Sequence, residues 1–222
     1  MKKFAIAIAT ATLSLLPLMA NASGGGHNEY IVDAPINPKD KVSLQNGAQL
    51  FVNNCMGCHG LKYMRYERMS EDLGIPVELT QQYLNFTTDK PGDTMGNAML
   101  EEESKVWFGV APPDLSLEAR LRSSDWLYSY LINFYEDASR PYGYNNHVFP
   151  SVGMPHVMAD MEEELDKEEF EKNMADLTNF LAYVAEPVRL ERERLGVYVL
   201  LFLFILFWPA YFMKKEFWKD IH

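Results

Sequence analysis

The sequence predicts a mainly α-helical protein, with long ordered loops in one domain and a single C-terminal transmembrane helix. Within the domain, apolar residues recur at helical spacing, whereas alternating strand patterns are scarce. Near the C-terminus, Leu195 to Met213 forms a run of 19 residues without a charge. Such a run approaches the roughly 20 residues that a helix needs to cross a bilayer.

The N-terminus has the pattern of a secretory signal peptide. A lysine pair precedes a short apolar run, and Ala20 and Ala22 provide the small residues of a cleavage site. A short membrane helix is the alternative, and Pro17 together with the small residues argues against it. We therefore expect residues 1–22 to be removed and the mature chain to lie outside the cytoplasm.

The apolar run at 195–213 is interpreted as a membrane span because a buried core helix usually keeps a polar face. Aromatic residues lie near its ends, as in interfacial belts, and basic residues flank both sides. The cleaved signal then sets the orientation. We expect residues 23–194 to form the periplasmic domain of a bacterial inner-membrane protein and residues 214–222 to form its cytoplasmic tail.

The charge of the domain is strongly negative. Without the lysine pair and the five charged residues of 214–222, the 20 basic and 31 acidic residues of the chain fall to 15 and 29, a net charge of −14. Nucleic acid is therefore excluded as a partner, since phosphate binding needs the opposite sign. A basic protein partner is favoured by this field, and plain solubility explains it equally well.

Five helices are expected in the domain, each from a periodic pattern with a start or stop signal. The start signals are Ser43, Pro76, Asn97 and Ser124, and the stop signals are Gly109 and Pro187. The helices are expected over 44–54, 76–86, 98–108, 125–138 and 170–184. The segments between them are rich in Pro, Gly and Asn, and the longest, 138–157, is of the kind that usually carries function.

The only two cysteines lie in the motif Cys55-Met56-Gly57-Cys58-His59. A disulfide would not require His59, a thioredoxin-like pair would need a βαβ setting, and a zinc site would need further ligands. C-x-x-C-H is instead the signature of covalent haem attachment. Two sulfurs three residues apart reach the two vinyl groups of one haem, and the adjacent histidine points at the iron. The motif therefore predicts one covalently bound haem c.

Gly47 and Phe51 precede Cys55 by eight and four residues and share one face of the expected helix. This pattern resembles the N-terminal helix of class I cytochromes c, in which a glycine allows a C-terminal helix to cross closely. The expected partner is the segment 175–186, with Leu181 and Tyr183 as candidate contacts.

The ligand on the opposite face of the iron decides the function. An open position would bind gases or peroxide, whereas a filled one favours electron transfer. Met154 lies between Gly153 and Pro155 in the long loop, and its thioether would raise the reduction potential. Three other residues remain open as rivals: Met158, His147 and His156.

Four motifs, in order, resemble the cytochrome c1 family. They are CMGCHGLKYMRYERM, APPDLS, NNHVFPSVGMP and LAYVAEP, the last leading through a charged link into a membrane helix. The resemblance implies the haem subunit of the ubiquinol–cytochrome c reductase (cytochrome bc1) complex. Cytochrome b and the Rieske iron–sulfur protein are then the implied partners, with a cytochrome c as electron acceptor, membrane lipid around the anchor and a dimeric complex.

The resemblance also implies roles for individual residues. Cys55 and Cys58 would form the thioethers, and His59 and Met154 would bind the iron. The loop Pro112, Pro113, Asp114 and Leu115 would pack on the haem face, and Arg120 would lie near a haem propionate. Independently of the resemblance, two prolines make this loop rigid, and Asp114 is expected to cap the following helix. Arg120 can equally be an ordinary surface arginine.

Two further features bear on the site. Val106, Trp107 and Phe108 stand where family members of the mitochondrial type have small polar residues, so the haem wall there is expected to differ. The run Asp160 to Glu171 holds eight acids and one lysine. It is interpreted either as part of a docking field for a basic cytochrome c or as the solvated face of a helix.

These observations predict an electron-transfer subunit that passes single electrons from a Rieske protein to a cytochrome c. No side-chain catalysis is expected, because the haem carries the redox chemistry. The alternatives are a membrane-anchored single-haem carrier for another oxidase or dehydrogenase and, from another class, a haem-based gas sensor or peroxidase.

Overall fold

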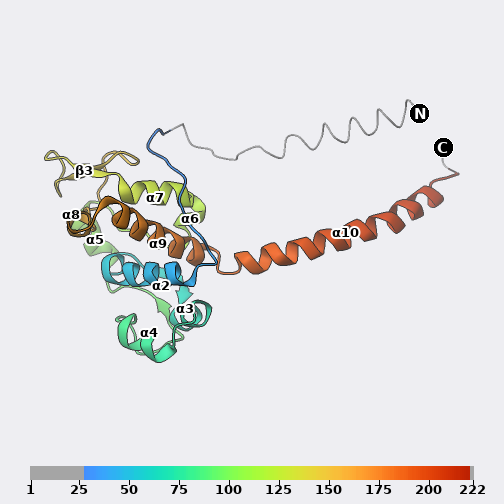
Figure 1. Ribbon diagram of the computed structural model, residues 1–222, viewed down its shortest axis with the longest axis horizontal. Coiled ribbons are helices and arrows are strands. Elements are labelled where there is room, and N and C mark those ends of the chain that lie inside the picture. Colours follow the sequence, from blue (N-terminus) through green and yellow to red (C-terminus); the bar gives the residue numbers. More distant parts are fainter. Residues whose placement is uncertain (1–27, 221–222) are drawn as a thin grey trace.

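The computed structural model describes residues 28–220 (Figure 1). The expected signal peptide therefore lies outside the described residues. A helical domain carries one long helix, α10, that projects away from it (Figure 1). The helices are α2 (Lys41–Leu50), η2 (Phe51–Cys55), α3 (Tyr66–Leu73), α4 (Val77–Tyr83), α5 (Glu101–Phe108), α6 (Glu118–Leu121), α7 (Ser124–Ile132), α8 (Ala159–Glu164), α9 (Lys167–Ala185) and α10 (Arg189–Phe217).

Within residues 28–220 the strands form two small antiparallel pairs, so the predicted mainly α-helical class is confirmed. In the first, β1 (Leu61–Arg65) pairs with β2 (Thr94–Met95) and has an irregular register between its two ends. In the second, β3 (Phe134–Glu136) pairs with β4 (Tyr144–Asn146), with Tyr135 opposite Asn145. Long connections between the elements make up much of the remaining domain.

The core of the domain is the crossing of α2 and α9, which lie side by side in Figure 1. Gly47 is at the crossing point: a Cβ placed there would lie 2.1 Å from the carbonyl oxygen of Asp176 and 2.6 Å from Cβ of Phe180. Phe51 packs on Phe180 with a ring separation of 6.0 Å. The expected glycine-mediated crossing is confirmed, but Gly47 meets Asp176 and Phe180 rather than Leu181 or Tyr183.

All four of the predicted helix start signals are displaced. Asp40 caps α2, because its carboxylate accepts from the amides of Val42 (3.0 Å) and Ser43 (3.2 Å). The hydroxyl of Ser43 instead accepts a hydrogen bond from Asn179 of α9. In α7 the capping hydroxyl belongs to Ser123, one residue before the predicted cap.

Helix α5 begins at Glu101 rather than after Asn97. Pro76 precedes the first residue of α4 instead of occupying it. The helix stop predicted at Gly109 is confirmed, since Gly109 has a left-handed φ of 77° that glycine adopts without strain.

The expected helix over 125–138 ends early, and this prediction was wrong beyond Ile132. The side chain of Asn133 donates to the carbonyl of Ser129 (2.8 Å), which occupies a carbonyl at the helix end. Residues 134–136 then pair with 144–146 as β3 and β4. Aromatic residues suit a strand as well as a helix, so their spacing did not distinguish the two.

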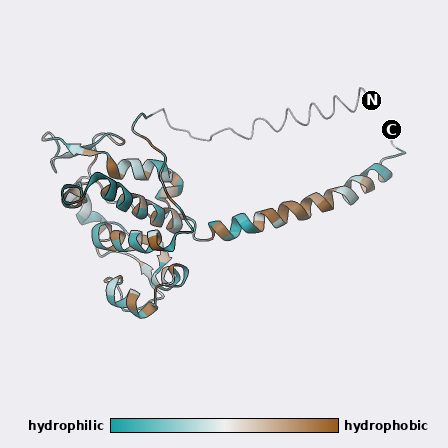
Figure 2. Cartoon of the chain, viewed as in Figure 1, coloured by the Kyte–Doolittle hydropathy of each residue, from teal (hydrophilic) through white to brown (hydrophobic). Residues whose placement is uncertain are grey.

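Helix α10 includes the charged link as well as the apolar run. Within the described residues it is the one helix long and apolar enough to cross a membrane, and its apolar stretch has no contact with the domain (Figure 2). Its first turns are fixed to the domain by Arg192, whose guanidinium bonds both carboxylate oxygens of Glu186 at 2.5 and 3.2 Å. The apolar helix fits a membrane anchor.

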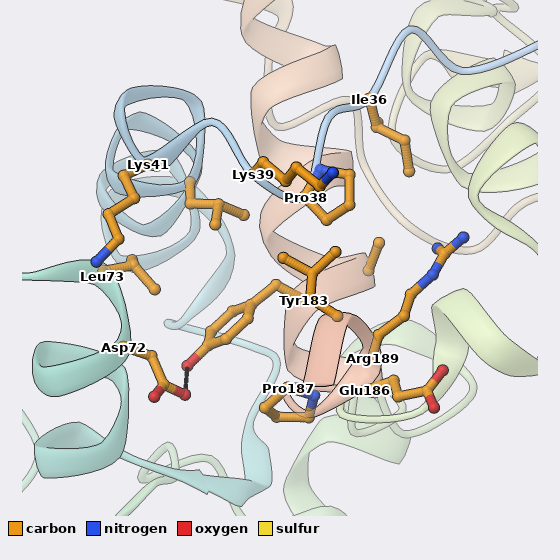
Figure 3. Close-up of a pocket in the computed structure, with 13 residues that line it drawn as sticks. Ile36, Pro38, Lys39, Lys41, Asp72, Leu73, Tyr183, Glu186, Pro187 and Arg189 are labelled. Atoms are coloured by element: carbon orange, nitrogen blue, oxygen red, sulfur yellow. Dashed lines mark hydrogen bonds between the residues drawn. The ribbon is translucent and has the colours of Figure 1, made fainter. Parts of the chain in front are cut away.

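A shallow cavity of about 300 Å³ lies where α2, α3 and α9 meet the start of α10 (Figure 3). Tyr183 crosses it and donates a hydrogen bond to Asp72 at 2.8 Å. None of the predicted haem residues lines this cavity. The cavity belongs to the base of the anchor, not to the haem site.

Candidate haem site

The C-x-x-C-H motif follows directly from the α2–α9 crossing. Helix α2 widens into one π-helical turn at 51–55, where the amide of Met56 bonds the carbonyl of Phe51 at 3.0 Å. The amides of Cys58 and His59 then both bond the carbonyl of Cys55, at 3.1 and 2.8 Å. Because π-turns occur preferentially at functional sites, this local widening marks the motif as a specialised helix end.

Cys55 and Cys58 are free thiols rather than a disulfide. Burial, with a smaller contribution from Cys58, raises the pKa of the Cys55 thiol to about 12. Cys55 is thus held neutral beneath the surface, while Cys58 is partly exposed. Both remain available for thioether bonds, as the haem prediction requires.

His59 is buried, and its Nδ1 lies 2.7 Å from the carbonyl oxygen of Pro113. A carbonyl accepts only, so Nδ1 carries the proton and Nε2 keeps its lone pair. Burial also lowers the pKa of His59, which favours the neutral ring. A neutral imidazole with one nitrogen bonded to a carbonyl is the usual state of a metal-binding histidine. His59 therefore fits the role of an iron ligand.

The Pro112–Ser116 loop is bonded to the chain that leaves the motif. The amide of Leu115 donates to the carbonyl of Gly60 at 2.9 Å. The carboxylate of Asp114 accepts from the amide of Lys62 at 2.8 Å, and the hydroxyl of Ser116 accepts from Tyr63 at 3.2 Å. These bonds hold Pro113 against His59.

Asp114 does not cap the following helix, so that prediction was wrong. Its second oxygen accepts from the amide of Ser116, and α6 begins after Leu117 without a side-chain cap. Sequence alone offered no reason to connect Asp114 to Lys62, which lies 52 residues earlier.

Two arginines lie near the end of this loop. Arg120 is exposed on α6. The Arg122 guanidinium lies over the rings of Trp126 and Phe149, at 4.5 and 5.4 Å from their centroids, and its Nε bonds Glu118 at 3.1 Å. Arg122 thus lies against the aromatic cluster around Tyr130, and the motif comparison did not single it out.

Met154 is partly buried, and its sulfur accepts a hydrogen bond from the hydroxyl of Tyr130 at 3.3 Å. Tyr130 stacks on Trp126 with centroids 5.1 Å apart. Burial raises the pKa of Tyr130 far above its usual range, so the hydroxyl keeps its proton and donates. One sulfur lone pair is thereby engaged, and the other remains available to a metal.

The loop that carries Met154 is held by side chains rather than by a helix or sheet. The carbonyl oxygen of the Asn146 side chain accepts from the amides of Val148 and Phe149, and its nitrogen donates to the carbonyl of Tyr130. Arg140 donates to the carbonyls of Ser151 and Val152 at 2.8 and 2.9 Å. These contacts fix the chain immediately before Met154.

The rival ligands are engaged elsewhere. His147 is stacked between Tyr30 and Tyr135 at centroid distances of 4.5 and 4.2 Å. His156 lies with its Nε2 2.7 Å from Glu162, and Met158 is buried in the hydrophobic core. These engagements favour Met154 as the ligand opposite His59.

A mainly helical domain with a C-x-x-C-H motif on a glycine-crossed helix, followed by an apolar anchor, defines a membrane-anchored c-type cytochrome. The family model for the Cytochrome C1 family matches the sequence over residues 30–221. The chain therefore belongs to this family. The resemblance inferred from the four motifs is thus confirmed. Proteins of this family carry one covalently attached haem c, which confirms the predicted cofactor.

Similar proteins include cytochrome c1 of Allochromatium vinosum, which is 47% identical over 95% of this chain and 96% of its own length. A protein named ammonia monooxygenase gamma subunit, from Nitrosomonas europaea, is 42% identical over 94% of this chain and 95% of its own. Cytochrome c1 of Cereibacter sphaeroides is 26% identical over 99% of this chain and 96% of its own.

Proposed function

We propose that the protein is the haem subunit of a ubiquinol–cytochrome c reductase and passes single electrons from a Rieske iron–sulfur protein to a cytochrome c. Membership of the cytochrome c1 family supports electron transfer within a complex that also contains cytochrome b and the Rieske protein. Cys55 and Cys58 would hold the haem c by thioethers, and His59 and Met154 would bind its iron. The haem supplies a one-electron couple.

The observation that carries this proposal is the matched pair of hydrogen bonds at the two ligand candidates. His59 donates Nδ1–H to the carbonyl of Pro113, and Met154 accepts from Tyr130. Each side chain therefore has a fixed orientation and a lone pair, on Nε2 of His59 and on the sulfur of Met154, that is available to a metal. A filled sixth position excludes gases and peroxide, so this pairing favours electron transfer over a gas sensor or a peroxidase.

Replacing Met154 with Leu tests the ligand assignment. We expect the purified complex to lose the charge-transfer band between methionine sulfur and ferric iron, and its haem c potential to fall strongly, because leucine has no donor atom. Met158→Leu is the matched control and should leave both unchanged. An unaltered spectrum and potential in Met154→Leu would place the ligand elsewhere.

Isolation of the membrane complex separates the reductase from the alternative of a single-haem carrier for another oxidase or dehydrogenase. We expect the chain to copurify with a cytochrome b and a Rieske protein in a dimeric complex, with lipid around α10. Isolation of the chain with an oxidase and neither of these subunits would favour the alternative.

We further propose that residues 1–22 are a cleaved signal peptide, 23–194 a periplasmic haem domain, 195–213 the membrane span and 214–222 a cytoplasmic tail. The covalent haem supports this orientation, because c-type haem is attached outside the cytoplasm. Protease treatment of spheroplasts should digest the haem domain, and the mature N-terminus should be Ser23. Protection of the domain in intact spheroplasts would reverse the orientation.

A further inference from the structure

We propose that His156 is a positioning residue for the sixth iron ligand: held by Glu162 and Phe134, it sets how firmly Met154 stays on the haem iron. The inference rests on the proposed function, because it takes Met154 as the ligand. It concerns a residue that the sequence leaves open as a rival ligand.

His156 is held on two sides. Its ring stacks on Phe134 with centroids 4.6 Å apart and an interplanar angle of 6°, and Tyr144 packs against it in a T-shaped arrangement with centroids 5.2 Å apart. Its Nε2 lies 2.7 Å from a carboxylate oxygen of Glu162. The His156 side chain is only 3% exposed, whereas that of Glu162 is 43% exposed. A buried imidazole is thus fixed by an acid that reaches it from the surface.

The contacts close a ring around Met154. The sulfur of Met154 bonds Tyr130, Tyr130 packs edge-on against Phe134 at 5.2 Å, and Phe134 stacks on His156. His156 is joined back to Met154 through Pro155, whose φ is fixed by its own ring. The sulfur and the backbone of Met154 are therefore both tied to Phe134.

This ring explains how a methionine in a loop can serve as a firm ligand. Outside a helix or sheet, the backbone around Met154 gains little from regular hydrogen bonding, so side chains must fix it. On the N-terminal side this is done by Arg140 and Asn146. On the C-terminal side, His156, only two residues from Met154, makes a part-buried polar contact with Glu162.

A purely structural role for His156 makes a different prediction. If His156 served only to fill the core, its loss would lower the stability of the fold and leave the iron ligand of the folded protein unchanged. If it positions Met154, its loss frees the sulfur for part of the time while the protein stays folded. Carbon monoxide then competes for the ferrous iron.

The experiment measures carbon monoxide binding to reduced haem c and its midpoint potential in the purified complex. The variants are His156→Ala, which removes both contacts, and His156→Phe, which keeps an aromatic ring but not the bond to Glu162. Glu162→Ala removes that bond from the other side. Glu163→Ala changes the same charge one residue along the same helix and is the matched control.

We expect Glu162→Ala and His156→Phe, which remove the hydrogen bond, each to raise the carbon monoxide association constant about tenfold, since a hydrogen bond to a charged group corresponds to at least that factor. His156→Ala, which also removes the aromatic stack, should give a larger increase, and Glu163→Ala none. The potential should fall in the same order.

Met154→Leu distinguishes a failure of the positioning role of His156 from a failure of Met154 as the iron ligand. If it binds carbon monoxide and loses potential while the His156 and Glu162 variants match wild type, the positioning role is wrong and the ligand assignment stands. If Met154→Leu itself matches wild type, the proposed ligand is wrong. If His156→Ala yields no complex, Glu162→Ala and His156→Phe decide, and wild-type values for both would overturn the inference.

Discussion

Replacing Gly47 with Ala should weaken the crossing of α2 and α9 and thereby destabilise the haem domain. The added Cβ would stand 2.1 Å from the carbonyl oxygen of Asp176 and 2.6 Å from Cβ of Phe180. Both atoms lie well inside van der Waals contact, and neither is the end of a flexible side chain. Relief therefore requires the two helices to move apart.

The size of the effect follows from two opposing terms. Overpacking of a well-filled core costs about 1–3 kcal/mol, and the rigid backbone contact at Asp176 favours the upper end. Alanine gains about 1 kcal/mol over glycine through its helix propensity. We therefore expect a net loss of about 2 kcal/mol in the free energy of unfolding, with Phe51 displaced from Phe180 at the start of the haem motif.

The assay is the thermal loss of the haem c absorbance spectrum in the purified complex, together with the haem content of the membranes. Gly196→Ala is the control, because Gly196 is also helical and a Cβ there meets nothing within 4 Å. Gly47→Ala should melt several degrees earlier than wild type, and Gly196→Ala should not. Equal stability of Gly47→Ala and wild type would refute the close crossing.

Three further predictions concern the site. Tyr130→Phe should lower the potential of haem c by about 20–40 mV in a redox titration, because the hydroxyl withdraws electron density from sulfur and so favours ferrous iron. This shift in potential corresponds to about 0.5–1 kcal/mol, the usual contribution of one hydrogen bond. Arg122→Gln should lower the potential by roughly 40 mV, since this cation lies over Trp126, which stacks on the Tyr130 that bonds Met154, and a cation there disfavours the oxidised haem. Arg120→Gln should have little effect, and a larger shift for Arg120 would make it the propionate partner. Asp114→Ala removes the acceptor of the Lys62 amide and should reduce the amount of haem-loaded protein in membranes. The cost is about 1 kcal/mol, because this hydrogen bond is exposed and water can replace the carboxylate. Unchanged haem content would contradict that role.

The contiguous parts of the site could be predicted from the sequence, because their chemistry is local. Five consecutive residues define the haem motif, and Gly47 lies a fixed number of helical turns before it. The residues that meet Gly47 could not be predicted, since they depend on the angle and offset at which α9 crosses α2. Leu181 and Tyr183 share the segment with Asp176 and Phe180, but they lie on other parts of its surface.

The supporting contacts could not be predicted because they join distant segments through single atoms. Asp114 was expected to cap the next helix, as aspartates after a loop often do, and it bonds Lys62 instead. The Tyr130 hydroxyl and the Met154 sulfur are 24 residues apart, and the end of the predicted helix between them proved to be the first strand of a hairpin. Helix starts moved for a related reason: Ser43 and Asp40 are both good caps, and the contact with Asn179 decides between them.

The acidic run at 160–171 can now be divided by what each acid does. Glu162 bonds His156, Asp166 caps α9 and Glu171 pairs with Lys167 at 3.6 Å. Three more acids lie in the first turn of a helix, where the helix dipole favours a negative charge. They are Asp160 in α8 and Glu168 and Glu169 in α9.

Only Glu163 and Glu164 then have no local role within the described part of the chain, and both are exposed on α8. Most of the run is accounted for by the helices that carry it, which favours the solvated-face interpretation for six of the eight acids. The docking interpretation stays a prediction, and Glu163 and Glu164, which follow Met154 by nine and ten positions, are the acids that no helix-end or ion-pair role explains. A steering effect on a basic cytochrome c would draw on all the exposed acids of the run together with the net negative charge of the whole domain, because a helix-end role does not remove an acid's charge.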